Sequence, residues 1–139
     1  MRTAIDTNVL SALWGREAPG LRVVTLLDDA NARGSLILCP VVYMECRANP
    51  WVREGQVDVF LETMRVAVEW LLEREIWELA AERFERYASR RRRHGGGEAR
   101  RFAADFLVAA HALLRADRLV TLDQRSYRTD FPELILVEP

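Results

Sequence analysis

The sequence predicts a three-layer α/β/α sandwich in which helices cover both faces of a mostly parallel central sheet. Strand-like and helix-like segments alternate along the 139 residues, and the strand-like runs are continuously apolar, as in strands buried on both faces. Half of the residues are hydrophobic, which is enough for one core at this length. We therefore expect a single domain that spans residues 1–139.

Caps and breakers mark the predicted elements. We expect strands at residues 2–5, 35–39, 66–70, 119–122 and 134–137. We expect helices at residues 7–14, 20–33, 40–48, 56–64, 73–92 and 100–116, with a short helical turn after Asp123. The polar cluster Asp6-Thr7-Asn8 caps the first helix, Gly34 ends the second, and Pro40 suits the first position of the third.

Three helices show apolar positions at helical spacing, which predicts the faces that they bury. In the helix at 20–33 these positions are Leu21, Val24, Leu26 and Leu27. In the helix at 73–92 they are Ile76, Trp77, Ala80, Phe84, Tyr87 and Ala88. In the helix at 100–116 they are Phe102, Phe106, Ala109, Ala110, Leu113 and Leu114. We interpret each of these stripes as core packing.

The composition excludes several classes of protein. The chain contains no lysine, which excludes Schiff-base chemistry, a P-loop and other phosphoryl-transfer sites that depend on lysine. Cys39 and Cys46 form no CxxC motif, so we expect both to pack in the interior. No apolar run approaches the ~18 residues of a membrane span, and no signal-peptide pattern is present. We therefore expect a cytoplasmic protein with no membrane partner.

Charge is distributed unevenly although the net charge is only −1. Residues 54–85 carry nine acidic residues, whereas residues 89–101 carry six arginines and one glutamate. Three consecutive glycines, 95–97, lie within the basic segment, and each costs a helix about 1 kcal/mol relative to alanine. This pattern predicts a mobile basic loop at residues 89–101.

Four carboxylates occupy positions that this architecture can bring to one edge of the sheet. Asp6 and Asp123 follow strands, Glu45 lies in the helix after the second strand, and Asp105 lies near a helix start. Clustered carboxylates repel one another, so such a group needs a proton or a cation, and oxygen-only ligands select a hard one. The sequence thus predicts a Mg²⁺ or Mn²⁺ site. The two histidines, His94 and His111, form no ligand pair, which disfavours zinc.

These motifs resemble those of PIN-domain nucleases, and most closely those of the VapC-type toxins of bacterial toxin–antitoxin pairs. The resemblance is carried by Asp6-Thr7-Asn8, by Glu45 within residues 41–46, by Asp105 within residues 105–112, and by Thr121-Leu122-Asp123. It implies that Asp6, Glu45, Asp105 and Asp123 form the catalytic metal site, supported by Thr7, Asn8 and Thr121. Some relatives carry a polar residue where this chain has Leu122, which leaves the number of bound metal ions open.

The resemblance implies a Mg²⁺- or Mn²⁺-dependent endoribonuclease that leaves a 3′-hydroxyl and a 5′-phosphate. It also implies a cognate antitoxin and a homodimer. A cation bridged mainly by Asp6 and Asp105 would activate water for in-line attack, while Glu45 and Asp123 orient ligands or a second ion. The alternative is a PIN-like domain that binds RNA or protein without cleaving, although clustered acids facing phosphate favour a nuclease. A phosphatase or receiver-like domain is disfavoured because such sites normally require a lysine.

The basic segment has three possible roles. Arg90, Arg91, Arg92, Arg93, Arg100 and Arg101 are candidates for contacts with the RNA backbone, because guanidinium groups pair well with phosphate. The segment is equally well explained as a solvated loop or as the binding site of an acidic antitoxin segment. Trp14 and Trp51 are further candidates for contact with a partner.

Overall fold

The computed structural model of this chain describes residues 1–15, 20–96 and 101–139. Its centre is a five-stranded parallel sheet with the strand order β3-β2-β1-β4-β5. The strands are β1 (Arg2–Ile5), β2 (Ser35–Leu38), β3 (Val66–Val68), β4 (Arg118–Val120) and β5 (Leu136–Val137). Strand β1 lies in the middle, with Ala4 paired with Ile37 of β2 on one side and with Leu119 of β4 on the other. The residues that follow β1 and β4 therefore meet at one edge.

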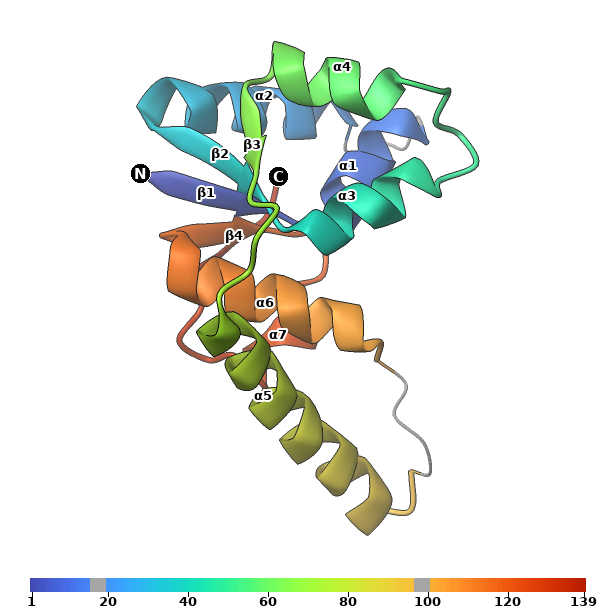
Figure 1. Cartoon of the computed structure of the whole chain (residues 1–139), viewed down its shortest axis with the longest axis vertical. Helices are drawn as coiled ribbons and strands as arrows, with labels where there is room; N and C mark the ends of the chain where they lie inside the picture. Colours follow the sequence, from blue (N-terminus) through green and yellow to red (C-terminus); the bar gives the residue numbers. More distant parts are fainter. Residues whose placement is uncertain (16–19, 97–100) are drawn as a thin grey trace.

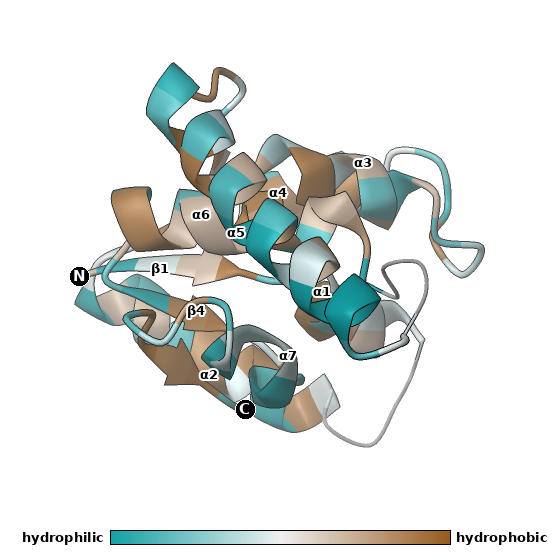
Figure 2. Ribbon diagram, turned by 90° about the horizontal axis from the view of Figure 1, so that it is seen from below, coloured by the Kyte–Doolittle hydropathy of each residue, from teal (hydrophilic) through white to brown (hydrophobic). Residues whose placement is uncertain are grey.

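Helices cover both faces of the sheet, as the sequence predicts. They are α1 (Thr7–Trp14), α2 (Gly20–Arg33), α3 (Pro40–Arg47), α4 (Gln56–Thr63), α5 (Arg74–Arg93), α6 (Ala103–Arg115) and α7 (Gln124–Arg128). Figure 2 shows β1 and β4 between α5 and α6 on one side and α2 and α7 on the other. Helix α5 packs along α6 and extends away from the sheet (Figure 1).

The core lies between the sheet and these helices. Leu36, Ile37 and Leu38 are consecutive and all buried, so strand β2 is covered on both faces. Phe106 of α6 and Leu27 of α2 pack in the same buried cluster. Both cysteines are buried, as expected. No helix in the described part of the chain is long and apolar enough to cross a membrane.

The predicted loop at residues 89–101 is partly wrong. Helix α5 continues through Ser89 to Arg93, and Gly95, with φ +67°, then leaves the helix in a left-handed conformation. The helix does not end at Ser89 because the glycine penalty begins only at residue 95, while the four arginines before it are good helix formers. Residues 97–100 of the predicted loop lie outside the described part.

The predicted apolar faces are only partly buried. Helix α2 buries Val23, Leu27 and Ala30, whereas Leu21 is 80% exposed. On the other side of the sheet, Trp77 of α5 is 55% exposed and Phe102, just before α6, is 79% exposed. Helical spacing identifies a stripe of apolar residues, but neighbouring elements decide how much of the stripe is covered.

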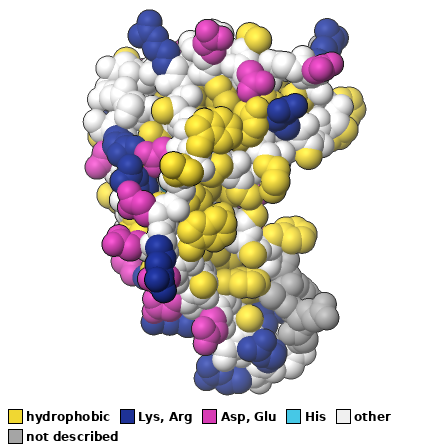
Figure 3. All heavy atoms as spheres, in the orientation of Figure 1, with side chains coloured by type: hydrophobic (Ala, Val, Ile, Leu, Met, Phe, Trp, Pro, Cys, Tyr) yellow, Lys and Arg dark blue, Asp and Glu magenta, His cyan; other side chains and the backbone are white. Residues whose placement is uncertain are grey.

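Some of the uncovered apolar side chains lie close together on one face of the molecule. An apolar groove of about 350 Å³ runs between α3, α5 and α6, with Val41, Trp77, Phe84 and Leu107 among its lining residues. Figure 3 shows hydrophobic side chains gathered down the middle of this face. We call this surface the apolar face.

Candidate functional site

The four carboxylates that the sequence singles out line one cleft of about 360 Å³ at the carboxyl ends of β1 and β4. Asp6 follows β1 and caps α1, and Asp123 follows β4 and caps α7. Glu45 projects from α3, and Asp105 lies in the first turn of α6. The cleft is also lined by Thr7, Asn8, Ser11, Ser126 and Tyr127. We call it the acidic cleft.

Asp6 is the most enclosed of the four acids, and its two carboxylate oxygens have different surroundings. Oδ2 accepts hydrogen bonds from Thr121 Oγ1 (2.8 Å), Tyr127 Oη (2.9 Å) and Asn8 Nδ2 (3.1 Å). Among the described residues, Oδ1 accepts only one, from the Thr7 backbone N–H at 2.8 Å. A carboxylate oxygen has about two lone pairs, so Oδ1 is the oxygen of Asp6 that retains a free one.

Asn8 and Thr121 join the start of α1 to the segment after β4. Asn8 Nδ2 donates to Thr121 Oγ1 (3.2 Å), and Asn8 Oδ1 accepts from the Leu122 N–H (3.0 Å). Thr121 Oγ1 also accepts from the Asp123 N–H at 3.1 Å. Asn8 and Thr121, two of the three predicted supporting residues, therefore tie Asp6 and the start of α1 to the segment after β4 across 113 to 115 residues of sequence.

Burial and mutual repulsion raise the pKa of three of the four acids. For Asp6, desolvation is the main cause, opposed by the hydrogen bonds from Thr121, Tyr127 and Thr7 and reinforced by the charge of Asp105. The pKa of Glu45 is raised by desolvation and by the charges of Asp105 and Asp6. Desolvation and the charge of Asp123 raise the pKa of Asp105, although Arg101 lowers it. The ionised cluster is therefore costly without a counter-charge.

Tyr127 and Ser126 are site residues that the sequence does not reveal. The buried Tyr127 hydroxyl donates to Asp6, and burial together with the charges of Asp6 and Asp105 raises the pKa of Tyr127 far above its ordinary value. Its proton therefore remains in place as a donor. Ser126 donates from both its N–H and its hydroxyl to the Asp123 carboxylate. Helix α7 has five residues, too few for a periodic pattern that would mark Tyr127 in the sequence.

The donor set of the acidic cleft suits a hard divalent cation. Within the described residues, no three His, Cys, Asp or Glu side chains stand ready as a complete metal site. The cleft nevertheless offers the free lone pair of Asp6 Oδ1 and the carboxylates of Glu45 and Asp105, and Mg²⁺ keeps several waters when one or two carboxylates hold it. The Thr7 hydroxyl is buried and has no partner of regular hydrogen-bond geometry there, although its proximity lowers the pKa of Glu45. These residues fit Mg²⁺ or Mn²⁺.

The two histidines do not contribute to this cleft. His111 is buried in α6, where its Nε2 lies 2.7 Å from Glu69 Oε2, and His94 caps the end of α5. Arg115 also donates to Glu69 (3.3 Å), as does Arg2. Glu69 therefore sits in an ion-pair network that ties the residue after β3 to β1 and α6.

The candidate arginines have separate environments. Arg90 pairs with the buried carboxylate of Asp130, and Arg91 Nη2 donates to Gly96 O at 2.6 Å. Arg92 and Arg93 are exposed on the last turn of α5, where Arg93 donates to Ser89 Oγ (3.1 Å). Arg101 Nη1 donates to Asp130 Oδ2 (3.2 Å) and to Ser126 O, next to the acidic cleft. Arg100 lies outside the described residues.

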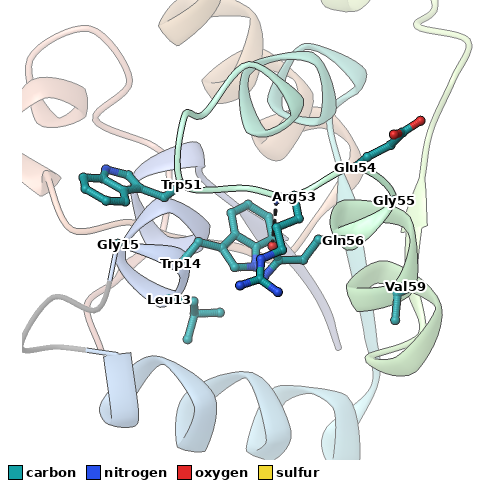
Figure 4. A pocket seen from close by; sticks show the side chains of 9 residues that line it. All are labelled: Leu13, Trp14, Gly15, Trp51, Arg53, Glu54, Gly55, Gln56 and Val59. Carbon is teal, nitrogen blue, oxygen red and sulfur yellow. Dashed lines mark hydrogen bonds between the residues drawn. The ribbon is translucent and has the colours of Figure 1, made fainter.

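A larger cavity of about 930 Å³ lies between α1, the segment before α4, and α4 itself. Figure 4 shows the side chains that line it, including Trp14 and Trp51, and the hydrogen bond from the Arg53 N–H to Gln56 Oε1 (2.9 Å). Trp14 packs edge-on against Phe60, with ring centroids 5.6 Å apart, whereas Trp51 is 72% exposed. None of the four acids lines this tryptophan cavity.

Comparisons with known proteins agree with this geometry. No curated protein sequence matches the chain. Among solved structures, VapBC2 from Rickettsia felis bound to a DNA fragment from their promoter matches with a TM-score of 0.65 and 17% identity, over 99% of this chain and 98% of that chain. FitAB bound to an IR36 DNA fragment matches with a TM-score of 0.63 and 22% identity, over 99% and 94% of the two chains.

FitAcB from Neisseria gonorrhoeae is also similar, with a TM-score of 0.62 and 21% identity over 96% of this chain and 95% of that chain. At these identities the likeness shows a shared fold. The family model of the PIN domain matches residues 3–132, a stretch that contains all four acids, Tyr127, strands β2, β3 and β4, and β1 from its second residue onward. The chain therefore belongs to the PIN domain family.

Proposed function

We propose that this protein is a Mg²⁺- or Mn²⁺-dependent endoribonuclease, and that it is the toxin of a type II toxin–antitoxin pair acting as a single domain in the cytoplasm. The observation that carries the proposal is the convergence of Asp6, Glu45, Asp105 and Asp123 on one cleft. They come from four separate elements, and a cluster of acids whose ionisation is disfavoured is typical of a site that works with a cation.

The proposed mechanism assigns each acid a task. Asp6, through Oδ1, and Asp105 would hold the cation, and Glu45 would accept the proton of the attacking water, a role that its raised pKa suits. Asp123, which Ser126 holds in place, would help to orient the groups bound in the cleft. When bound, the cation supplies charge stabilisation for in-line attack of water on the phosphodiester. Tyr127 and Thr121 fix the position of Asp6, and their hydrogen bonds favour its ionised form.

An antitoxin is the proposed protein partner. Two similar structures, VapBC2 and FitAB, are bound to DNA fragments, and the resemblance to VapC-type toxins implies a cognate antitoxin for this chain. In this chain, the tryptophan cavity offers a partner the exposed indole of Trp51. We also propose a homodimer, for which the apolar face offers an uncovered hydrophobic surface.

Cleavage of structured RNA in the presence of Mg²⁺, Mn²⁺ or EDTA tests the enzymatic proposal. We expect the wild-type protein to cleave RNA with either cation and not in EDTA. We expect the cleavage rate of Asp6→Asn to fall at least ~10²-fold, which is the loss typical when a group that stabilises the transition state is removed. Asp28→Asn is the matched control, because Asp28 is an exposed acid on α2 that does not line the acidic cleft. Equal cleavage by Asp6→Asn, or cleavage that persists in EDTA, would contradict the mechanism.

The same experiment distinguishes a nuclease from the alternative function, which is binding of RNA without cleavage. RNA that binds in every condition but is never cut would favour a PIN-like domain that binds without cleaving. Co-expression with the protein encoded by the adjacent gene tests the toxin assignment, since a cognate antitoxin should form a stable complex and suppress cleavage. Suppression that is unchanged by Trp51→Ala would exclude the tryptophan cavity as the antitoxin contact.

A further inference from the structure

A second, basic pocket of about 380 Å³ lies beside the acidic cleft, between the end of α5 and α7. Among the described residues, its lining includes four arginines and one carboxylate: Arg90, Arg91, Arg101, Arg125 and Asp130. Positive side chains therefore outnumber negative ones in the described lining, which favours a local positive potential. A site of this charge attracts an anion.

Asp130 holds two of the arginines in place. Its carboxylate is 4% exposed and pairs with Arg90 and with Arg101, whose Nη1 lies 3.2 Å from Oδ2. The Arg101 guanidinium is further fixed over two rings, with its Cζ 4.6 Å from the Phe106 centroid and 5.2 Å from the Tyr127 centroid. Its Nη2 is buried and has no hydrogen-bond partner in the described structure, so this rigid group retains a donor.

Arg125 differs from Arg90 and Arg101 because none of the described residues binds its guanidinium group. It is exposed on α7, and it forms neither an ion pair nor a hydrogen bond with the described residues. Arg128, three residues later on the same short helix, instead donates to Gln124 Oε1 (2.6 Å) and does not line the pocket. A long cationic side chain kept at the mouth of a basic pocket is suited to bind phosphate oxygens.

The basic pocket and the acidic cleft share a wall. Ser126 lines both, and Arg101 contacts both, since it donates to Ser126 O while its Nε lies 4.0 Å from Asp105 Oδ2. A polyanion that enters the acidic cleft meets repulsion from four carboxylates, and an adjacent cluster of arginines offsets that repulsion. A single RNA strand can therefore contact both sites at once.

We infer that the basic pocket is a subsite for a backbone phosphate of the RNA strand, next to the phosphate that is cleaved over the acidic cleft. This inference rests on the proposed nuclease function, because it names where the substrate of that cleft is anchored. The pocket recognises phosphate and not a base, so it adds affinity without sequence preference. Arg125 makes the direct contact, and Arg101, held by Asp130, forms the pocket floor.

Substitution of Arg125 tests the subsite, with Arg128→Ala as the matched control from the same helix. For Arg125→Ala we expect the KM for RNA to rise about tenfold with kcat within about twofold, because one charged contact is lost from substrate binding. The slope of log K against log salt concentration should fall by about 1, as for the loss of one phosphate contact. Arg128→Ala should match the wild type in both, and circular dichroism should show that all variants are folded.

A scan of the substrate locates the contact. Replacing one linkage at a time by an uncharged methylphosphonate should raise the wild-type KM at one linkage flanking the cleaved one. Arg125→Ala should be insensitive to the change at that linkage, because the phosphate charge no longer has its partner. Equal sensitivity of the wild type and Arg125→Ala at every linkage would overturn the subsite.

A binding measurement keeps this test separate from the nuclease proposal. Fluorescence anisotropy with labelled single-stranded RNA in EDTA measures affinity without any cleavage. Weaker binding by Arg125→Ala than by Arg128→Ala supports the phosphate subsite even if the wild type proves unable to cleave. Equal binding by the two variants overturns the subsite even if the wild type is an efficient nuclease.

Discussion

Replacing Tyr127 with phenylalanine should weaken Mg²⁺ binding about tenfold while leaving the fold in place. The tyrosine ring is buried and phenylalanine preserves its packing, so only the hydroxyl that donates to Asp6 Oδ2 is lost. A hydrogen bond to a charged group contributes about 1.5–3 kcal/mol. The lower end applies here because Thr121 and Asn8 still donate to the same oxygen, and ~1.4 kcal/mol corresponds to a factor of ten in affinity.

The same substitution should move the pH dependence of metal binding. Burial raises the pKa of Asp6 and the Tyr127 hydrogen bond lowers it, so removing that bond raises this pKa further. Since the ionised carboxylate is the ligand, Mg²⁺ binding by the variant should be lost at a higher pH than in the wild type as the solution is acidified.

Isothermal titration calorimetry with Mg²⁺ and Mn²⁺ at several pH values measures both effects. Tyr43→Phe is the matched control, because it removes a tyrosine hydroxyl that donates to the exposed carboxylate of Asp58 (2.9 Å) outside the acidic cleft. If Tyr127→Phe binds Mg²⁺ within twofold of Tyr43→Phe and shows the same acid limb, Tyr127 does not tune Asp6 and the reasoning is wrong.

Three further substitutions probe the acidic cleft, the Glu69 network and the apolar face. Asp105→Asn should raise the melting temperature in EDTA at pH 7 by about 2–4 °C, measured by calorimetry, since the raised pKa of Asp105 means that its charge costs stability above that pKa. A lower melting temperature would contradict this. Burial opposes ionisation of Glu69, but hydrogen bonds from Arg115, His111 and Arg2 lower its pKa overall. Ionised Glu69 therefore stabilises the folded state above the ordinary glutamate pKa, and this stabilisation is lost as pH falls through the lowered pKa. Urea unfolding should therefore show Glu69→Gln less stable than the wild type at pH 7, with the difference vanishing in acid; a constant difference would refute the linkage. Trp77→Glu should convert the proposed dimer into a monomer in light scattering, and an unchanged mass would exclude the apolar face as the dimer contact.

The parts of the site that the sequence predicts are those with a local signature. Asp6 and Asp123 each stand between a strand and a helix, where a capping carboxylate is visible in the residue order. Glu45 and Asp105 have no such signature, because a single acid on a helix is usually a surface group. Their expected place at the same sheet edge, together with the resemblance, joined them to the other two. The structure places all four in the same cleft.

The parts that sequence does not predict depend on distant partners. Tyr127 reaches Asp6 across 121 residues, and Asp130 pairs with Arg90 across 40, so neither pairing leaves a pattern within one element. The arginines at 90–93 suggested a solvated loop, whereas the helix continues through them and Asp130 fixes one of them. Trp77 follows helical spacing but is left half uncovered, because periodicity does not report what packs against a face.

The central position of β1 has a consequence for the order in which the molecule is made. Its neighbour β4 begins at Arg118, so a growing chain that has not yet emerged beyond that residue holds Asp6 with only Thr7 and Asn8 as hydrogen-bond donors. Synthesis reaches three residues of the acidic cleft only after β4 has begun: Thr121 and Tyr127, whose hydroxyls donate to Asp6, and Asp123, which supplies a carboxylate. Non-local contacts of this kind form late and slowly. Assembly of the acidic cleft therefore waits until the chain has left the ribosome beyond Tyr127.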